Sequence, residues 1–366
     1  MAEQRKLDVM LKNSEAAQRG RAAVGRSRQG RSASAASVTL IPGDGIGPEV
    51  TEAALRVIDA LGVRIEWDRQ LAGAAAFREH GDPIPEALIR SLKRTRIALK
   101  GPLETRVAAG FRSINVYLRK NFDLYASIRP VHSFEGVYAP FHNVNLVVVR
   151  ENTEDLYTGL EHQVTPGVVE SIKVITARAS KRIAKFAFEF ARKQRRRSVT
   201  AIHKANIMKL SDGLFLKCAR EVARLYPDIA YHEQIVDAAC MRLVTDPAAF
   251  DVLLLENLYG DIVSDLCAGL VGGLGVVPGA NYGDRGAIFE AVHGTAPDIA
   301  GRGVANPIAL ILSSAMLLDY VGQRRSGQKI RRAVGTVLRR GKVLTRDIGG
   351  RATTEQMTEA VIGALE

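Results

Sequence analysis

The chain has 366 residues and a net charge of +12, with 46% apolar and 25% charged residues. These values are typical of a soluble globular protein with one large domain or two ordinary ones, and they exclude a disordered chain. The longest largely apolar stretch, 307–318, is shorter than the roughly 20 residues of a membrane-spanning helix, so we expect no membrane segment. Three widely spaced cysteines (Cys218, Cys240 and Cys267) support neither a disulfide framework nor a zinc site and favour a reducing compartment.

The first 37 residues form a basic extension with eight Lys or Arg and three acidic residues. From residue 18 to residue 37 it offers too little apolar surface to offset the entropy of ordering, so we expect it to be disordered. Its Arg and Ser content is similar to that of an organellar presequence, but the early acidic residues and the lack of an amphipathic stripe argue against one. Binding of phosphate or nucleic acid by the arginines is the alternative to a solvated tail. We favour the tail and expect no nucleic-acid partner.

Strand-like and helical runs alternate from residue 38 onward. The predicted strands are 38–41, 96–99, 144–149, 199–203, 229–236, 252–255 and 287–290, and the predicted helices are 49–61, 178–193, 212–225, 262–270, 307–320, 327–339 and 355–365. This alternation predicts an α/β fold with a largely buried sheet. Two longer strand candidates, 145–150 and 168–175, are expected to pair as antiparallel neighbours, so the predicted sheet is mixed.

The turn at 43–47 (GDGIG) lies between a predicted strand and a predicted helix, as a dinucleotide fingerprint does. The fingerprint would need a third glycine at Pro48, and Asp44 would put a carboxylate against the pyrophosphate. The sequence therefore predicts an ordinary tight turn here and no Rossmann cofactor site.

Asp261 and Asp265 are four residues apart, and they lie on one face of a predicted helix near its start. Two carboxylates at this spacing repel each other, and a Mg²⁺ or Mn²⁺ ion between them would relieve the repulsion. The alternative is an acidic first turn favoured by the helix dipole, and the spacing alone does not separate the two.

A polar and cationic series lies between residues 113 and 150. Guanidinium groups bind carboxylates through two parallel hydrogen bonds, so converging arginines suit a small polyanion, and the alternative is ordinary surface charge. The candidates are Ser113, Asn115, Arg119, Arg129 and Arg150. A loop at 293–298 (HGTAPD) follows a predicted strand, and its small residues would let a ligand approach the backbone.

Taken together, these segments resemble the β-decarboxylating dehydrogenases, the family of isocitrate, isopropylmalate, homoisocitrate and tartrate dehydrogenases. The resemblance covers residues 38 to about 365, and its motifs stand in the family's order. The matching stretches are IPGDGIGPE (41–49), LKGPLET (99–105), RSINVYLRK (112–120), DLYASIRP (123–130), RENTE (150–154), HKANIMKLSDGLF (203–215), NLYGDIVSDL (257–266) and HGTAPDIAG (293–301).

The resemblance implies two α/β domains with the active site in the cleft between them. One domain would comprise 38–124 plus 272–366 and hold the cofactor, and the other, 125–271, would hold the metal site and the dimer interface. A homodimer or higher oligomer would share residues across each site. NAD would bind without a Rossmann loop, and the cofactor residues implied are Ile41, Glu290, His293, Gly294, Thr295, Ala296, Asp298 and, near the adenine, Asn306.

Substrate and cofactor choice follow from a few positions of the resemblance. Ser113 and Asn115 match the isocitrate-specific members, whereas the isopropylmalate enzymes have leucines there, and Thr105 matches a threonine at the same edge. NADP-dependent relatives place a lysine and a tyrosine where Asp298 and Ile299 stand. A carboxylate there accepts hydrogen bonds from the ribose hydroxyls and repels a 2′-phosphate, so NAD is expected.

The implied reaction is oxidation of isocitrate followed by decarboxylation to 2-oxoglutarate. Asp261 and Asp265, with Asp237 of the partner subunit, would hold Mg²⁺ or Mn²⁺. Lys204, also contributed across the dimer, would be the general base, and Tyr157 would protonate the enolate. Arg119, Arg129 and Arg150 would hold the substrate carboxylates. The expected location is the cytoplasm, or the mitochondrial matrix in a eukaryote.

Two positions depart from the family pattern. Asp155-Leu156 replace the usual glycine and acidic residue before Tyr157, and Glu256 stands where threonine or proline is usual, adding a negative charge beside the metal site. Two alternatives remain open. One is a homoisocitrate, isopropylmalate or tartrate dehydrogenase, and the other is a regulatory subunit of a hetero-oligomeric isocitrate dehydrogenase.

Overall fold

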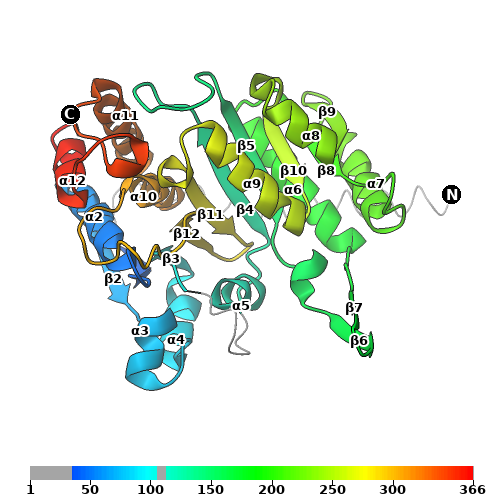
Figure 1. The fold of residues 1–366 in the computed structure, drawn as a ribbon, viewed down its shortest axis with the longest axis horizontal. Coiled ribbons are helices and arrows are strands. Elements are labelled where there is room, and N and C mark those ends of the chain that lie inside the picture. The colour runs from blue at the N-terminus through cyan, green and yellow to red at the C-terminus, as the bar shows by residue number, and fades with distance from the viewer. Residues whose placement is uncertain (1–34, 105–112, 366) are drawn as a thin grey trace, which may run out of the picture. The chain divides into compact units, whose positions relative to one another are not determined.

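The computed structural model describes residues 35–104 and 113–365, which contain a ten-stranded mixed sheet with helices on both faces (Figure 1). The strands are β1 (Ala36–Ile41), β2 (Ile65–Arg69), β3 (Ile97–Lys100), β4 (Ala126–His132), β5 (Asn145–Glu151), β6 (Glu161–Thr165), β7 (Val168–Ser171), β8 (Ser198–His203), β9 (Ala230–Ile235), β10 (Val252–Leu255), β11 (Pro278–Tyr282) and β12 (Ala287–Ala291). The helices are α2 (Gly47–Ala60), α3 (Gly73–His80), α4 (Glu86–Thr95), α5 (Ile114–Asn121), α6 (Ala177–Lys193), α7 (Ser211–Ala223), α8 (Val236–Leu243), α9 (Asn257–Leu270), α10 (Ile308–Tyr320), α11 (Arg324–Arg340) and α12 (Thr354–Ile362).

The strand order of the large sheet is β2-β1-β3-β12-β11-β4-β5-β10-β8-β9. Strands at both ends pair in parallel, whereas β12, β11, β4 and β5 pair antiparallel in the middle. The predicted α/β class and mixed sheet are therefore confirmed. The predicted division into 38–124 plus 272–366 and 125–271 falls between β11 and β4, and it stays a prediction.

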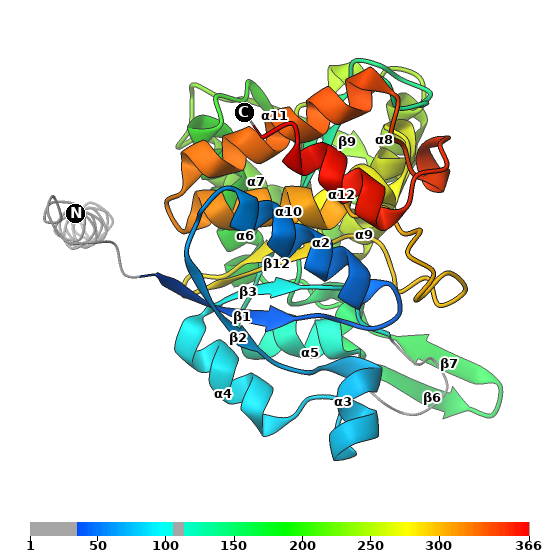
Figure 2. The ribbon, with the colours of Figure 1, turned by 90° about the vertical axis from the view of Figure 1, so that its left-hand side faces the viewer.

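Helices cover both faces of the sheet at each end. On β1, β3 and β12, α2, α10, α11 and α12 form one layer and α3, α4 and α5 form the opposite layer (Figure 2). At the other end, α8 and α9 pack on one face of β5, β8 and β10, and α6 and α7 pack on the other. Across the described residues, every helix is too short or too polar to span a bilayer.

Strand β10 shows why the central strands are apolar along their whole length. Leu253 and Leu255 pack in the cluster that contains the buried face of α9, while Val252 and Leu254 pack against α6 and α7. Because both faces of the strand are buried, polar alternation is lost, as expected for a covered parallel strand.

The predicted pairing of 145–150 with 168–175 is wrong. Strand β5 pairs with β4 and β10, whereas Val168–Ser171 pairs with Glu161–Thr165 in a separate two-stranded sheet, β6–β7. All residues of β6 and β7 are exposed, and the hairpin projects from the body of the molecule (Figures 1 and 2). Both segments have strand-like composition, but composition does not specify the partner, which is decided by the long-range packing of β4.

Several boundaries also differ from the prediction. Strand β1 begins at Ala36, two residues earlier than expected, and the predicted strand 229–236 ends at Ile235 because Val236 already begins α8. Helix α9 begins at Asn257, five residues before the predicted start, so Asp261 lies in its second turn.

Candidate active site

An arginine–aspartate cluster joins β4, β5 and α9. Arg129 Nη1 is 2.8 Å from Asp265 Oδ1, and its Nη2 is 3.6 Å from Asp261 Oδ1. Arg150 pairs with Asp261 through Nη1, and its Nε and Nη2 donate to Asn257 Oδ1 at 3.0 and 2.7 Å. The cation between the two predicted metal-binding carboxylates is therefore, within this chain, a guanidinium. The two aspartate side chains are 40% and 56% exposed, so both carboxylates are open to a ligand.

Tyr157 completes this cluster. It lies in the 3₁₀ turn Asp155–Thr158, and its hydroxyl donates to Asp261 Oδ2. Burial, together with the adjacent Asp261 carboxylate, raises the pKa of Tyr157. Burial opposes ionisation of Asp261, but Arg150 and the tyrosine hydroxyl hold the pKa of that carboxyl below its usual value. At neutral pH the phenol thus keeps its proton and the carboxylate its charge.

Lys204 and Asp237 form a separate pair at the ends of β8 and β9. Lys204 Nζ is 2.6 Å from Asp237 Oδ1, and this contact lowers the pKa of the Asp237 carboxyl. Among the described residues, no hydrogen bond or ion pair joins this pair to Asp261 or Asp265. Nor does any group of three or more His, Cys, Asp or Glu side chains within residues 35–104 and 113–365 have an arrangement that could hold a metal ion. Within one chain, the predicted metal ligands are divided between two places.

Glu290 is the centre of a buried polar cluster at the end of β12. Its carboxylate accepts from Lys100 Nζ at 2.6 Å, from Asn281 Nδ2 at 2.6 Å and from Arg119 Nη2 at 3.3 Å. Burial opposes ionisation, but Lys100 and Arg119 lower the pKa of Glu290 to about 2. Glu290 thus holds Arg119 and Lys100 in place.

A cavity of about 130 Å³ brings predicted substrate and cofactor residues together. It is lined by Asn115, Arg119, Arg129, Glu290, His293 and Gly294, together with Lys100, Ser127 and Asn281. Among the described residues, three buried polar atoms of these side chains find no hydrogen-bond partner: Asn115 Oδ1, Arg119 Nε and His293 Nε2. Buried polar atoms are normally satisfied, so three unsatisfied ones around one cavity indicate a ligand that supplies the missing contacts.

His293 also borders a second, larger cavity of about 950 Å³. Asp298 and Asn306 line it, as the cofactor prediction requires, and burial lowers the pKa of His293, so its imidazole is neutral. Asn306 is already occupied, because its Nδ2 donates to Asp347 Oδ2 at 2.9 Å and its Oδ1 accepts from Ile308 N at 3.0 Å. A volume of this size is in the range of small-molecule and cofactor sites.

The loop at 293–298 is fixed against the glycine turn. The carbonyl of Thr295 accepts from Ile46 N at 2.9 Å, and a Cβ at Gly45, where φ is +58°, would lie 2.0 Å from that carbonyl oxygen. Ala296 has a φ of +39°, a backbone conformation that is uncommon for a residue with a side chain. Gly45 therefore lets the loop at 293–298 pack against the turn, because a side chain at this position would clash with Thr295.

Asp44, in the same turn, has a structural role. Its carboxylate accepts three backbone N–H groups, from Ala74, Ala75 and Glu104, at 3.0 to 3.1 Å. Ile41, predicted to contact the cofactor, is fully buried among apolar side chains and lines neither cavity. Ile46, which was not predicted, lines the larger one.

The structure gives less information on two predicted substrate residues, Ser113 and Thr105. Ser113 occupies the N-cap position of α5, directly before the turn that carries Asn115. Thr105 lies outside the described residues.

Other contacting groups were missed by sequence reasoning. Lys100, Asn281 and Ser127 line the smaller cavity, and Asn281 and Arg150 both pair with Ser127 across neighbouring antiparallel strands. A signal for Lys100 exists, since it is a single charge at the end of an apolar strand followed by Gly-Pro. Asn281 carries no such signal. Its role comes from the pairing of three strands that are distant in sequence.

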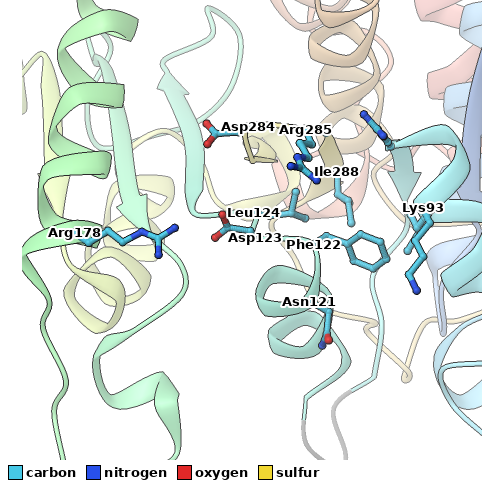
Figure 3. Close-up of a pocket in the computed structure, with 12 residues that line it drawn as sticks. Lys93, Asn121, Phe122, Asp123, Leu124, Arg178, Asp284, Arg285 and Ile288 are labelled. Atoms are coloured by element: carbon cyan, nitrogen blue, oxygen red, sulfur yellow. The ribbon is translucent and has the colours of Figure 1, made fainter. Parts of the chain in front are cut away.

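A further cavity of about 680 Å³ lies apart from these groups. Lys93, Arg178 and Arg285 line it around Phe122, and Figure 3 shows Arg178 facing it from the opposite side to Lys93. Within the described chain, none of the predicted site residues borders it. We therefore do not assign this cavity to the active site.

The fold and the site define a dehydrogenase of the isocitrate/isopropylmalate type. The family model described as isocitrate/isopropylmalate dehydrogenase matches residues 37–361, and the chain belongs to this family.

Among relatives, mitochondrial isocitrate dehydrogenase (NAD) subunit alpha from Bos taurus is 52% identical over 328 residues, covering 89% of each chain. The Homo sapiens protein of the same name is 52% identical over 326 residues with the same coverage. Among solved structures, isocitrate dehydrogenase from Methylococcus capsulatus matches with a TM-score of 0.88 and 50% identity. That match covers 90% of this chain and 99% of the other.

Proposed function

We propose that this chain oxidatively decarboxylates isocitrate to 2-oxoglutarate and CO₂, with NAD⁺ as hydride acceptor. The observation that carries the proposal is the set of unsatisfied buried atoms on Asn115, Arg119 and His293 around the smaller cavity. Arg119 Nε can donate to a carboxylate of a hydroxy acid. Asn115 Oδ1 and His293 Nε2 can accept from a hydroxyl or amide group, since the Nδ1 of the neutral imidazole lies 3.0 Å from the Gly294 carbonyl and donates to it. The names of the relatives, which specify isocitrate and NAD, support the same reaction.

The arginines bind and orient the substrate. Arg129 lines the smaller cavity and reaches Asp261 and Asp265, so it lies between the substrate pocket and the metal ligands. Arg119 is held by Glu290 with its Nε unpaired, which leaves one donor for a carboxylate. Ser113 is the N-cap of α5 and Asn115 lies in its first turn, and both would meet the carboxylate that distinguishes isocitrate from an isopropyl-bearing acid.

The donor set fits a divalent cation. Asp261 and Asp265 offer exposed carboxylate oxygens one helical turn apart, and oxygen-only ligands suit Mg²⁺ or Mn²⁺. Asp237 of the partner subunit would be the third ligand. When bound, the ion would polarise the substrate hydroxyl and its neighbouring carboxylate.

Two side chains handle protons. The partner subunit's Lys204 would accept the substrate hydroxyl proton at Nζ, and Tyr157 would donate a proton from Oη to carbon after CO₂ leaves. The raised pKa of Tyr157 suits a donor that must remain protonated at neutral pH. Its hydrogen bond to Asp261 fixes the direction of the hydroxyl beside the metal ligands.

NAD is assigned to the larger cavity. Asp298 would accept the ribose hydroxyls and disfavour a 2′-phosphate, while Arg302, Arg346 and Arg351 line the same cavity and can meet the pyrophosphate. His293 borders both cavities, which supports a cofactor that extends from one into the other.

A second chain is needed to complete the site. Large apolar side chains are exposed on the loop after β8 and on α8 and α9, beside Lys204, Asp237 and Asp261. They are Ile207, Leu210, Met241, Val244 and Ile262. Such a surface fits burial against another copy or a related subunit, and it would carry Lys204 and Asp237 into the neighbouring site. We propose the mitochondrial matrix as the location if the source is eukaryotic, since the named relatives are mitochondrial, and the cytoplasm otherwise.

The test is cofactor reduction by the purified chain with Mg²⁺ or Mn²⁺, using isocitrate, isopropylmalate, homoisocitrate and tartrate, each with NAD⁺ and NADP⁺. We expect isocitrate with NAD⁺ to give the highest kcat/KM. A different preferred acid would contradict the assignment of Ser113 and Asn115. Inactivity on every acid, with stimulation of a co-purified catalytic subunit, would favour the regulatory-subunit alternative.

A further inference from the structure

Lys173 forms a buried ionic bridge outside the active site. Its Nζ lies 2.6 Å from Asp212 Oδ1 and 2.6 Å from Glu256 Oε2. The carboxyl side chains are 0% and 2% exposed, and the lysine side chain is 12% exposed. The ammonium group also lies 4.6 Å from the ring centre of Tyr259. The buried ammonium and the buried Asp212 carboxylate require each other, because either charge alone would be costly to desolvate, and the Glu256 carboxyl completes the contacts of the ammonium.

Each carboxylate leads to a different part of the proposed active site. Asp212 Oδ2 accepts from the backbone N of Lys204 at 2.7 Å, directly where β8 ends. Glu256 precedes α9, and its backbone carbonyl accepts from Gly260 N at 2.9 Å, in the first turn of the helix that carries Asp261 and Asp265. Lys173 thus connects the backbone of the proposed base to the helix of the proposed metal ligands.

The segment around Lys173 makes a second connection to α9. Asp155 N donates to the carbonyl of Val174 at 2.8 Å, and Asp155 Oδ2 accepts from Leu258 N at 2.7 Å. Asp155 begins the 3₁₀ turn that contains Tyr157. This segment therefore fixes the first turn of α9 and the position of Tyr157 as well.

We propose that Lys173 is a positioning residue that holds the backbone of Lys204 in register with the first turn of α9. This rests on the proposed function, in which Lys204 serves the partner's site and Asp261 serves this chain's own site. The bridge thereby links the geometry of two neighbouring active sites through one side chain. Glu256, which departs from the family pattern, is the residue through which Lys173 contacts the start of α9.

The test uses hydrogen–deuterium exchange and kinetics on the full-length oligomer. Lys173→Met is compared with Lys181→Met, a control that removes an exposed pair with Glu221 at 2.7 Å. We expect Lys173→Met to speed exchange at least tenfold in both 204–210 and 256–262, to lower kcat at least tenfold and to change the KM for isocitrate less than threefold. Lys181→Met should leave all four values unchanged.

A folded Lys173→Met variant with exchange and kcat within twofold of the parent chain would overturn the proposal, as would loss of protection in only one segment. If Lys173→Met gives no cooperative melt, Glu256→Leu decides, because it breaks only the contact of Lys173 with the start of α9. For Glu256→Leu we expect faster hydrogen–deuterium exchange in 256–262 alone, together with a lower kcat. If neither the exchange nor kcat changes, Lys173 does not position α9 and the proposal is refuted. An inactive parent chain would contradict the proposed function, while the exchange data would still decide the role of Lys173.

Discussion

The arginine–aspartate cluster on α9 and the Lys173 bridge are built from the same kinds of charged group, but they differ in access to solvent. Asp261 and Asp265 are 40% and 56% exposed, whereas Asp212 and Glu256 are 0% and 2% exposed. Exposed carboxylates can exchange a guanidinium for a metal ion or substrate at little cost, whereas buried ones cannot lose their cation without a large desolvation penalty. Solvent exposure of the carboxylates therefore distinguishes the groups that bind ligands from the groups that stabilise the fold.

The largest effect is expected at the exposed cluster. Asp261→Asn keeps the side-chain shape but removes a metal-binding charge, so kcat/KM for isocitrate should fall on the order of 10³-fold, since metal-ion stabilisation is worth several kcal/mol. The melting temperature should fall as well, because Asp261 is the carboxylate partner of Arg150, whose side chain is only 1% exposed. Asp228→Asn, which removes an exposed pair with Arg192, is the control. A kcat/KM within tenfold of that of the parent chain would contradict the inference that the exposed Asp261 carboxylate binds the metal ion.

Asn115→Leu removes Asn115 Oδ1, a buried atom that has no hydrogen-bond partner among the described residues. A leucine cannot supply the amide that isocitrate would meet, so kcat/KM for isocitrate should fall by about 10²-fold, and discrimination against isopropylmalate should weaken. Asn121→Leu, at the end of the same helix and away from the cavity, should leave both values unchanged. Equal losses in the two variants would show that Asn115 acts on the helix and not on the substrate.

Glu256→Gln tests the buried bridge through pH. Burial, opposed by Lys173 and reinforced by the nearby Asp212 and Asp155, raises the pKa of Glu256 to about 8. The folded state therefore binds a proton that the unfolded state has released, and stability falls as pH rises from about 4.5 to about 8. Glu256→Gln should remove this fall, which is on the order of a few kcal/mol, since one pKa unit corresponds to about 1.4 kcal/mol.

Urea unfolding at pH 5, 6.5 and 8 measures this difference. The gap in the free energy of unfolding between Glu256→Gln and the parent chain should grow in favour of the variant as pH rises. A gap that stays constant over this range would show that Glu256 remains ionised in the bridge throughout.

The smallest effect is expected at Asp298, on the larger cavity. Asp298→Asn removes the charge that repels a 2′-phosphate but keeps a hydrogen-bonding group, so the ratio of kcat/KM with NADP⁺ to that with NAD⁺ should rise by about tenfold. Asp284→Asn, at the cavity that the site residues do not border, is the control. An unchanged ratio would place cofactor choice in other residues of the cavity, such as the arginines.

Much of the site was predictable because its groups stand at strand ends or one helical turn apart. Asp261 and Asp265 share a helix face, and Arg150 lies at the end of a predicted strand, whereas β4, the strand that carries Arg129, was not predicted. Lys173 was not predictable from local pattern, because it lies in an irregular segment after an exposed hairpin and its partners are 39 and 83 residues away. The charge of Glu256 was noticed, but its cation was not.

Although it left strands such as β4 and β11 unpredicted, the sequence by itself determined the α/β class, the types of the predicted elements and the order of the chemical motifs. These depend on periodicity and on residues that are neighbours in the chain, such as the apolar run of β10. Only the tertiary structure decided that β5 pairs with β4 instead of Val168–Ser171, and that Glu290 fixes Arg119 across 171 residues. Strand partners and buried ion pairs are long-range contacts, chosen by the packing that excludes water from the whole sheet, and no local pattern encodes them.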